Sequence, residues 1–318
     1  MTICSCNSLG RSLLVLLFAG FIICPGNIMA QPLTAKDTLG KIIIREGDKE
    51  ILHFQYQSKS YHGEYERAGY VHPLYGLNGE VLTEDMPEDH PYHRGIFWAW
   101  HQVLLNGKKV ADGWMSENIR WKPLQINIEK RPDALRLNNE MCWRLITGKD
   151  TVDLVKEHTQ ITVFARQGNI RMIDFDIHLF PLLDNISLGG SEDEKGYGGF
   201  CMRLNLPADI RFRSGEKTIT PKETAVMADN WMDFTGSFSG KGKPASGIFA
   251  LAQSEGEPTR QLWILRSQKS MQNIVDPGNK PARIPSAGWH RKYRLVVHDG
   301  DLGIEKINQL TASFNEIK

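Results

Sequence analysis

The sequence predicts an all-β protein, built as one large antiparallel β-sandwich with few helices. Short runs rich in β-branched and aromatic residues recur along the chain, and glycine-containing turns separate them at close intervals. This pattern is typical of a sandwich, whereas strands alternating with long helical segments would indicate a parallel sheet. The strand candidates are Lys41–Arg45, Glu50–Gln57, Ala134–Ile146, Thr151–Ala165, Asn169–Phe180, Gly199–Leu206, Ser246–Ala252, Gln261–Arg266 and Lys292–His298.

The segment Asn169–Phe180 shows the clearest strand pattern. Its side chains alternate between two faces, because successive residues of a strand point in opposite directions. The apolar face holds Phe175, Ile177 and Leu179, and the polar face holds Asp174, Asp176 and His178. A face with two acids and a histidine is either an exposed sheet surface or the lining of a polar cleft.

One helix is predicted near the C-terminus, at Ile304–Ile317. Its apolar residues recur at three- and four-residue spacing from Ile304 to Phe314. The rest of the chain shows no repeat period, low-complexity tract or interdomain linker. Residues 31–318 are therefore expected to form a single β-sandwich domain.

Residues 1–30 have the features of a secretory signal peptide. A basic residue precedes the apolar run Leu13–Cys24, and the segment ends in the small residue Ala30. About 12 apolar residues are too few to span a bilayer, which needs roughly 20. A lipoprotein signal at Cys24 is disfavoured, because Ile23 stands where a small residue is expected. We therefore expect a periplasmic or secreted protein that does not span a membrane.

Charge and cysteine content narrow the functions further. The chain has 38 basic and 37 acidic residues, and this balance argues against a nucleic-acid partner. Beyond the leader only Cys142 and Cys201 remain, so at most one disulfide can form. A metal site built on cysteine ligands is excluded by the same count.

The stretch Thr83–Gln102, TEDMPEDHPYHRGIFWAWHQ, concentrates groups that can carry chemistry. Imidazole titrates near neutral pH, so His90 and His93 could transfer protons. Arg94 beside them offers a fixed fork of donors for a carboxylate or a developing oxyanion. These residues form the predicted catalytic loop.

Two alternatives for this loop stay open. His90 and His93 could bind a divalent metal ion together with Asp89 or Glu84, although the sequence lacks the HExxH helix of a metalloprotease. The loop could instead be structural, with Asp89 paired to Arg94 and the histidines capping the following strand.

The eight tryptophans suggest a carbohydrate partner, because sugar rings stack on indole faces. At least half of these rings could instead belong to the core. Trp114 and Trp231 lie beside turn residues and are the better candidates for a cleft. In the enzyme hypothesis Trp98 or Trp231 would stack on the sugar, and Arg203 and Asp233 would orient it. Asp233 lies between apolar neighbours, where a raised pKa could suit a general acid, or it could be a turn residue that accepts N–H groups.

Four stretches of the chain resemble the PmoA-like family of exported bacterial proteins. They are YVHPLYGLNGEVLTEDMPEDHPYHRGIFWAW, GYGGFCMRL, NWMDFTG and KYRLVVHDG, and the family signature is a TxDxPxDHPHHRG segment. The likeness covers most of the mature chain. It implies an antiparallel β-sandwich similar to the sugar-mutarotase and polysaccharide-lyase supersandwich, and a sugar-related role.

The chain departs from the family pattern at two places. Tyr92 stands where the family often has a second histidine, which weakens a metal site with three histidines. The segment ADGW departs from an Asp-aromatic-Trp run, which leaves the role of Asp112 open. The family label refers to a methane oxygenase subunit with several membrane spans, whereas this chain has none beyond its leader.

The leading hypothesis is an exported enzyme that acts on a glycoside or a sugar acid by hydrolysis, elimination or epimerisation. His90 and His93 would transfer protons, and Arg94 would stabilise negative charge. The expected substrate-binding or supporting residues are His72, Glu84, Asp89, Trp98, Arg203, Trp231 and Asp233. The alternatives are a non-catalytic carbohydrate-binding protein and a metal-dependent oxidoreductase. No cofactor is predicted apart from the divalent metal ion that His90 and His93 could bind.

Overall fold

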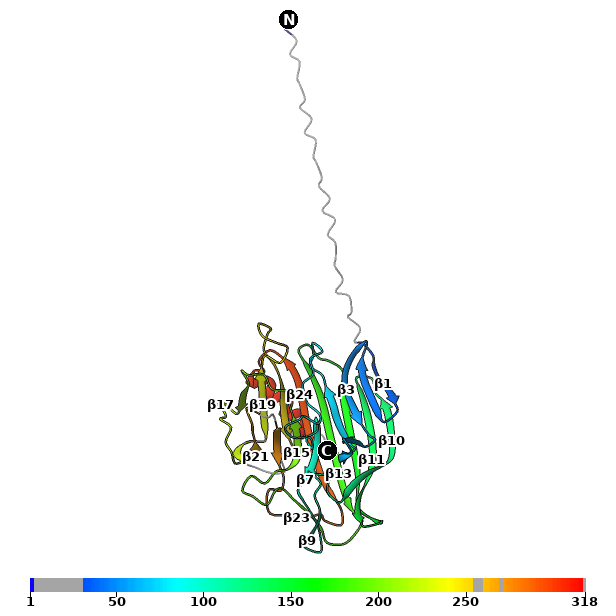
Figure 1. Ribbon diagram of the computed structural model, residues 1–318. Coiled ribbons are helices and arrows are strands. Elements are labelled where there is room, and N and C mark those ends of the chain that lie inside the picture. Colours follow the sequence, from blue (N-terminus) through cyan, green and yellow to red (C-terminus); the bar gives the residue numbers. More distant parts are fainter. Residues whose placement is uncertain (3–30, 254–259, 269–270, 317–318) are drawn as a thin grey trace. The chain divides into compact units, whose positions relative to one another are not determined.

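Within the described residues, two nine-stranded antiparallel sheets make up most of the protein. Figure 1 shows the computed structural model, in which strands predominate. The structure describes residues 1–2, 31–253, 260–268 and 271–316. Apart from its first two residues, the predicted leader lies outside the described residues. Residues Gln31–Lys318 form one compact unit. The prediction of an all-β sandwich is confirmed.

The first sheet contains the segments that carry most of the predicted site. Its strands are β1 (Leu33–Thr38), β2 (Lys41–Glu46), β3 (Lys49–Gln55), β6 (Tyr70–Leu74), β7 (Ile96–Trp100), β15 (Gly198–Arg203), β18 (Val226–Asp229), β21 (Arg260–Ile264) and β22 (Met271–Val275). They are ordered β1-β2-β3-β6-β7-β15-β22-β21-β18. β7 therefore lies between β6 and β15, although β15 follows it about a hundred residues later in the chain.

The second sheet contains the longest strands. They are β10 (Ile119–Lys130), β11 (Ala134–Thr147), β12 (Asp150–Phe164), β13 (Ile170–Pro181), β16 (Arg211–Ser214), β17 (Lys217–Thr218), β19 (Trp231–Gly236), β20 (Ser246–Ala252) and β24 (Trp289–Asp299). Their order is β10-β11-β12-β13-β24-β20-β19-β16-β17. β12, β13 and β24 are adjacent, so residues at matching positions on these strands form rows across the sheet.

Two small sheets and one helix complete the described fold. β8 (Gln102–Leu105), β9 (Lys108–Ala111), β14 (Ile186–Gly189) and β23 (Ala282–Arg283) form a four-stranded sheet, and β4 (Lys59–Tyr61) pairs with β5 (Glu64–Arg67). The helix α1 (Ile304–Asn315) begins at the predicted position.

The two large sheets share one apolar core, which explains the alternation seen in the sequence. Phe175, Ile177 and Leu179 of β13 are each no more than 2% exposed, whereas their polar neighbours are only partly buried. Trp98 of β7 reaches across from the first sheet to contact Phe175, with ring centroids 6.5 Å apart. Burying side chains of this size contributes about 1.5–3 kcal/mol each, so the alternation fixes which face of each strand points inward.

The helix α1 covers part of the outer face of the second sheet. Its buried residues Ile307, Leu310 and Phe314 pack in one cluster with Trp231 of β19 and Val296 of β24. This second cluster is separate from the core between the sheets. Part of the polar outer face beside α1 remains open.

The two cysteines beyond the leader and the helix content bear on two expectations from the sequence, that at most one disulfide can form and that the chain does not span a membrane. Cys142 and Cys201 are both buried free thiols, and burial raises the pKa of the Cys142 thiol to about 11. No helix of the described residues is long and apolar enough to cross a membrane.

Candidate functional site

The connection between β6 and β7 holds the histidine-rich stretch. It lies beside the end of β15, because β6, β7 and β15 are neighbours in the sheet. The N–H of Arg203 donates to the carbonyl of Gly95 at 2.7 Å, and the N–H of Glu84 donates to the carbonyl of Arg203 at 3.0 Å. The sheet thus brings Arg203 next to Glu84, which lies 119 positions earlier in the chain.

The Arg203 side chain connects the groups of this site. Arg203 is 3% exposed, and its guanidinium donates through Nε to Glu84 at 2.7 Å and through Nη2 to Asp89 at 3.0 Å. Its Nη1 lies 3.2 Å from Nδ1 of His93. Two carboxylates and an imidazole therefore surround one buried cation. We call Glu84, Asp89, His90, His93 and Arg203 the histidine cluster.

The two histidines of the cluster are stacked but have different surroundings. Their ring centroids are 4.6 Å apart and the rings are almost parallel, at 2°. His93 is 6% exposed, and burial, together with the charges of His90 and Arg203, lowers its pKa to about 2. His93 is therefore neutral, and its Nδ1 can accept a hydrogen bond from Arg203.

His90 has a carboxylate partner instead. Its Nδ1 lies 2.8 Å from Oδ2 of Asp89, and its side chain is 26% exposed. Burial raises the pKa of Asp89, but the hydrogen bond with His90 and the charge of Arg203 outweigh it and leave the pKa below its usual value. A charged Asp89 can orient the His90 imidazole, as carboxylates do in acid/base sites.

Arg94 has a structural environment. It is fully buried, and its guanidinium donates to the carbonyl oxygens of Pro91 at 2.7 Å and His93 at 3.2 Å and to that of Tyr65. These contacts hold the backbone of the loop in place. The anion-stabilising role predicted for Arg94 has no support in them, and neither does the alternative pairing of Arg94 with Asp89.

Aromatic rings surround the cluster. The Trp114 ring is 6.0 Å from the His93 ring, and Trp114 is 2% exposed. Tyr92 contacts both His90 and His93 edge-on, at 5.6 and 4.8 Å. Tyr197, from the connection before β15, contacts Trp114 at 5.4 Å. Tyr92 and Tyr197 are partly exposed and can present apolar ring surface to a ligand.

A second Asp–His pair also contacts Trp114, and sequence reasoning missed it. Nδ1 of His101 is 2.9 Å from Oδ2 of Asp112, and the His101 ring stacks on Trp114 at 5.1 Å. Oδ1 of Asp112 accepts hydrogen bonds from the backbone N–H groups of Trp114 and Met115. The Asp-Gly-Trp turn was the available signal, because aspartate commonly accepts from backbone groups two or three residues ahead.

His72 lies in the same part of the sheet but outside the cluster. It is on β6, and its Nδ1 lies 3.0 Å from the hydroxyl of Thr83. Burial lowers its pKa to about 4. His72 is thus a neutral residue that helps fix the start of the histidine-rich connection.

Three predicted binding residues lie elsewhere. Trp98 is 1% exposed inside the core, and Trp231 is 6% exposed under α1, so neither ring has an open face for a sugar. Asp233 is 1% exposed and contacts His298 at 3.0 Å and Arg213 at 2.9 Å. Burial acts to raise the pKa of Asp233, but the hydrogen bonds and charges of His298 and Arg213 outweigh it and leave the pKa below its usual value. The raised pKa suggested for Asp233 as a general acid is therefore wrong.

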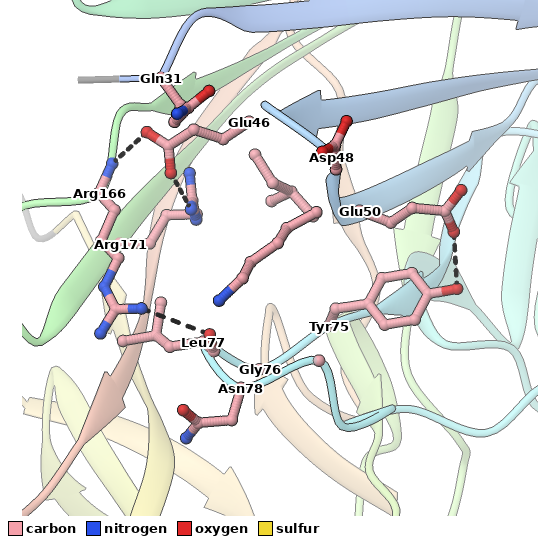
Figure 2. A pocket seen from close by; sticks show the side chains of 13 residues that line it. Gln31, Glu46, Asp48, Glu50, Tyr75, Gly76, Leu77, Asn78, Arg166 and Arg171 are labelled. Atoms are coloured by element: carbon pink, nitrogen blue, oxygen red, sulfur yellow. Dashed lines mark hydrogen bonds and ion pairs between the residues drawn. The ribbon is translucent and has the colours of Figure 1, made fainter. Parts of the chain in front are cut away.

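A separate pocket of about 570 Å³ opens between the β2–β3 hairpin, the turn after β6, the connection between β12 and β13, and the start of β13 (Figure 2). Glu46 accepts a hydrogen bond from Arg171 at 2.6 Å, and the hydroxyl of Tyr75 donates to Glu50 at 3.0 Å. None of the site residues predicted from the sequence lines this pocket.

The chain matches one known protein family over most of its length. Residues 41–312 match a family of unknown function, DUF6807, and the chain belongs to that family. No curated protein matches the chain. The resemblance to PmoA-like proteins stays a prediction.

Proposed function

We propose that this protein is an exported carbohydrate-active enzyme that acts on a glycoside or a sugar acid, with His90 as its proton-transfer group. The observation that carries this proposal is the row Arg203–Asp89–His90. A buried guanidinium holds a charged carboxylate, and the carboxylate lies 2.8 Å from a partly exposed imidazole. Export is supported by the sequence of residues 1–30.

The neighbouring groups suggest how the work is divided. His93 is neutral and stacked under His90, so in this proposal it positions the reacting imidazole and transfers no proton. Arg203 takes the place that the sequence suggested for Arg94, as the cation that contacts Asp89 and His93. Tyr92 and Tyr197 are the rings on which a sugar could stack.

The first test is a screen of glycans and glycosides that records both binding and product formation. On a substrate found in this way, His90→Gln should lower kcat about 10²–10⁴-fold, the usual contribution of a general acid or base. Asp89→Asn should also lower it, because the amide no longer carries the charge that orients the imidazole. His62→Gln is the matched control, since His62 is exposed on a turn between β4 and β5.

Turnover by His90→Gln at the rate of the control would exclude the proton-transfer role. The partly exposed rings of Tyr92 and Tyr197 also fit a protein that binds carbohydrate without converting it. In that case Tyr92→Ala and Tyr197→Ala should weaken binding, while His90→Gln should leave it nearly unchanged and no product should form.

A further inference from the structure

Three histidines form a row on the outer face of the second sheet, far along the chain from the histidine cluster. His158 of β12 is directly opposite His178 of β13, and His178 is directly opposite His290 of β24. The polar face predicted for β13 is therefore extended by its two neighbours. Asp176 lies on the same face, one position along, because side chains two residues apart point the same way.

Two of these imidazoles converge on one oxygen atom. Nε2 of His178 is 2.8 Å and Nε2 of His290 is 2.7 Å from Oδ1 of Asp176. The two rings are stacked, with centroids 3.8 Å apart and planes 21° apart. One ligand atom from each of the three residues can be chosen so that all lie within 4.8 Å of one another.

This arrangement has the chemistry of a transition-metal site. Imidazole and carboxylate are the ligands that suit zinc and its neighbours in the first transition row. Zinc–nitrogen and zinc–oxygen bonds of about 2.0–2.2 Å place tetrahedral ligand atoms about 3.4 Å apart. Asp176, His178 and His290 have side chains that are 28%, 32% and 43% exposed, so they have room to rotate. Small rotations can widen the present nitrogen–oxygen distances of 2.8 and 2.7 Å to the distance that a bound ion requires.

The surroundings leave one carboxylate oxygen for the ion. Both histidines contact Oδ1 of Asp176, whereas Nζ of Lys292 lies 3.8 Å from the other oxygen, Oδ2. Oδ1 is therefore the oxygen that faces the two imidazoles. Two hollows flank the group: one of about 270 Å³ is lined by Asp176 and Lys292, and another of about 260 Å³ is lined by His290 and Lys292. A bound ion would therefore keep coordination positions open toward solvent or a ligand.

We propose that Asp176, His178 and His290 bind one divalent transition-metal ion, with zinc as the representative ion. The site uses none of the residues of the proposed carbohydrate chemistry and does not depend on it. The competing reading is that Asp176 only accepts hydrogen bonds from two surface imidazoles. The two readings differ in whether the protein takes up one ion per chain at this position.

Isothermal titration calorimetry with zinc chloride on the metal-free protein tests the proposal. The wild-type protein should bind one ion that His178→Ala and His290→Ala each weaken at least about 100-fold, since even the loss of an outer-shell partner costs 10–100-fold. Asp176→Asn should weaken binding as well. A thermal melt of each variant shows whether the fold is retained.

Two controls make the assignment specific. His158→Ala removes the third imidazole of the row, and the double variant His90→Ala/His93→Ala removes the histidines of the cluster. Both should keep one ion with an affinity within about threefold of the wild type. The proposal is overturned if the wild type binds no zinc, if His178→Ala and His290→Ala bind it as well as the wild type, or if a control loses it equally.

Discussion

Acidification should destabilise this protein through His93, and the size of the effect follows from its surroundings. In the folded state burial, His90 and Arg203 lower the pKa of His93 to about 2, whereas an unfolded chain has a histidine pKa of about 6.5. Below about pH 6.5 the unfolded chain binds a proton that the folded protein does not. The stability from neutral His93 is therefore complete above that pH and is lost as the pH falls toward 2. Between about pH 7 and 4.5 the loss is about 2–3 kcal/mol.

Urea unfolding at about pH 7 and 4.5 measures this effect. His93→Asn keeps an acceptor for Arg203 but cannot take up a proton, so its free energy of unfolding should fall by about 2–3 kcal/mol less than that of the wild type over this range. His62→Asn, on an exposed turn, should behave as the wild type does. If His93→Asn and the wild type lose the same free energy to within about 0.5 kcal/mol, His93 is not held neutral.

Two further predictions concern stability, each measured by chemical denaturation with a matched control. Arg203→Met should cost about 3 kcal/mol, because it leaves Glu84 and Asp89 without their buried cation. Arg211→Met, whose side chain is 58% exposed, should cost less than about 1 kcal/mol, and equal costs would contradict the assigned network. Phe314→Ala should cost about 3–5 kcal/mol by opening a cavity under α1, while Ile304→Ala, 44% exposed on the same helix, should change stability by about 0.5 kcal/mol or less. A small effect of Phe314→Ala would mean that α1 does not depend on this contact.

The long strands could be predicted because they alternate. β13 has one face in the core and one face that is only partly buried, so its sequence carries the period-two signal. β20 is buried throughout and was recognised as a short apolar run, and it has the predicted bounds. β10 was missed, because most of its residues are exposed or only partly buried and it lies at the edge of its sheet. β17, with two residues, is too short to show any period.

The candidate site was predicted only as far as its residues are close in sequence. The stretch from Glu84 to His93 could be recognised as a unit, and its members do lie together. That Arg203 joins them depends on the pairing of β15 with β7, which no local pattern reveals. The prediction for Trp231 failed for a similar reason: no local pattern shows that α1 covers its ring.

The connection between β6 and β7 is longer than the fold requires. Neighbouring antiparallel strands can be joined by a two-residue hairpin, whereas this connection uses residues 75–95 and buries the guanidinium groups of Arg94 and Arg203 against it. Buried ionic groups are a weak means of stabilising a fold, because removing charges from water costs about as much as their attraction returns. Long ordered loops of this kind are more often functional than structural. The burial of Arg94 against carbonyls and of Arg203 against Asp89 is thus better explained as a way to hold His90 in one position than as a contribution to stability.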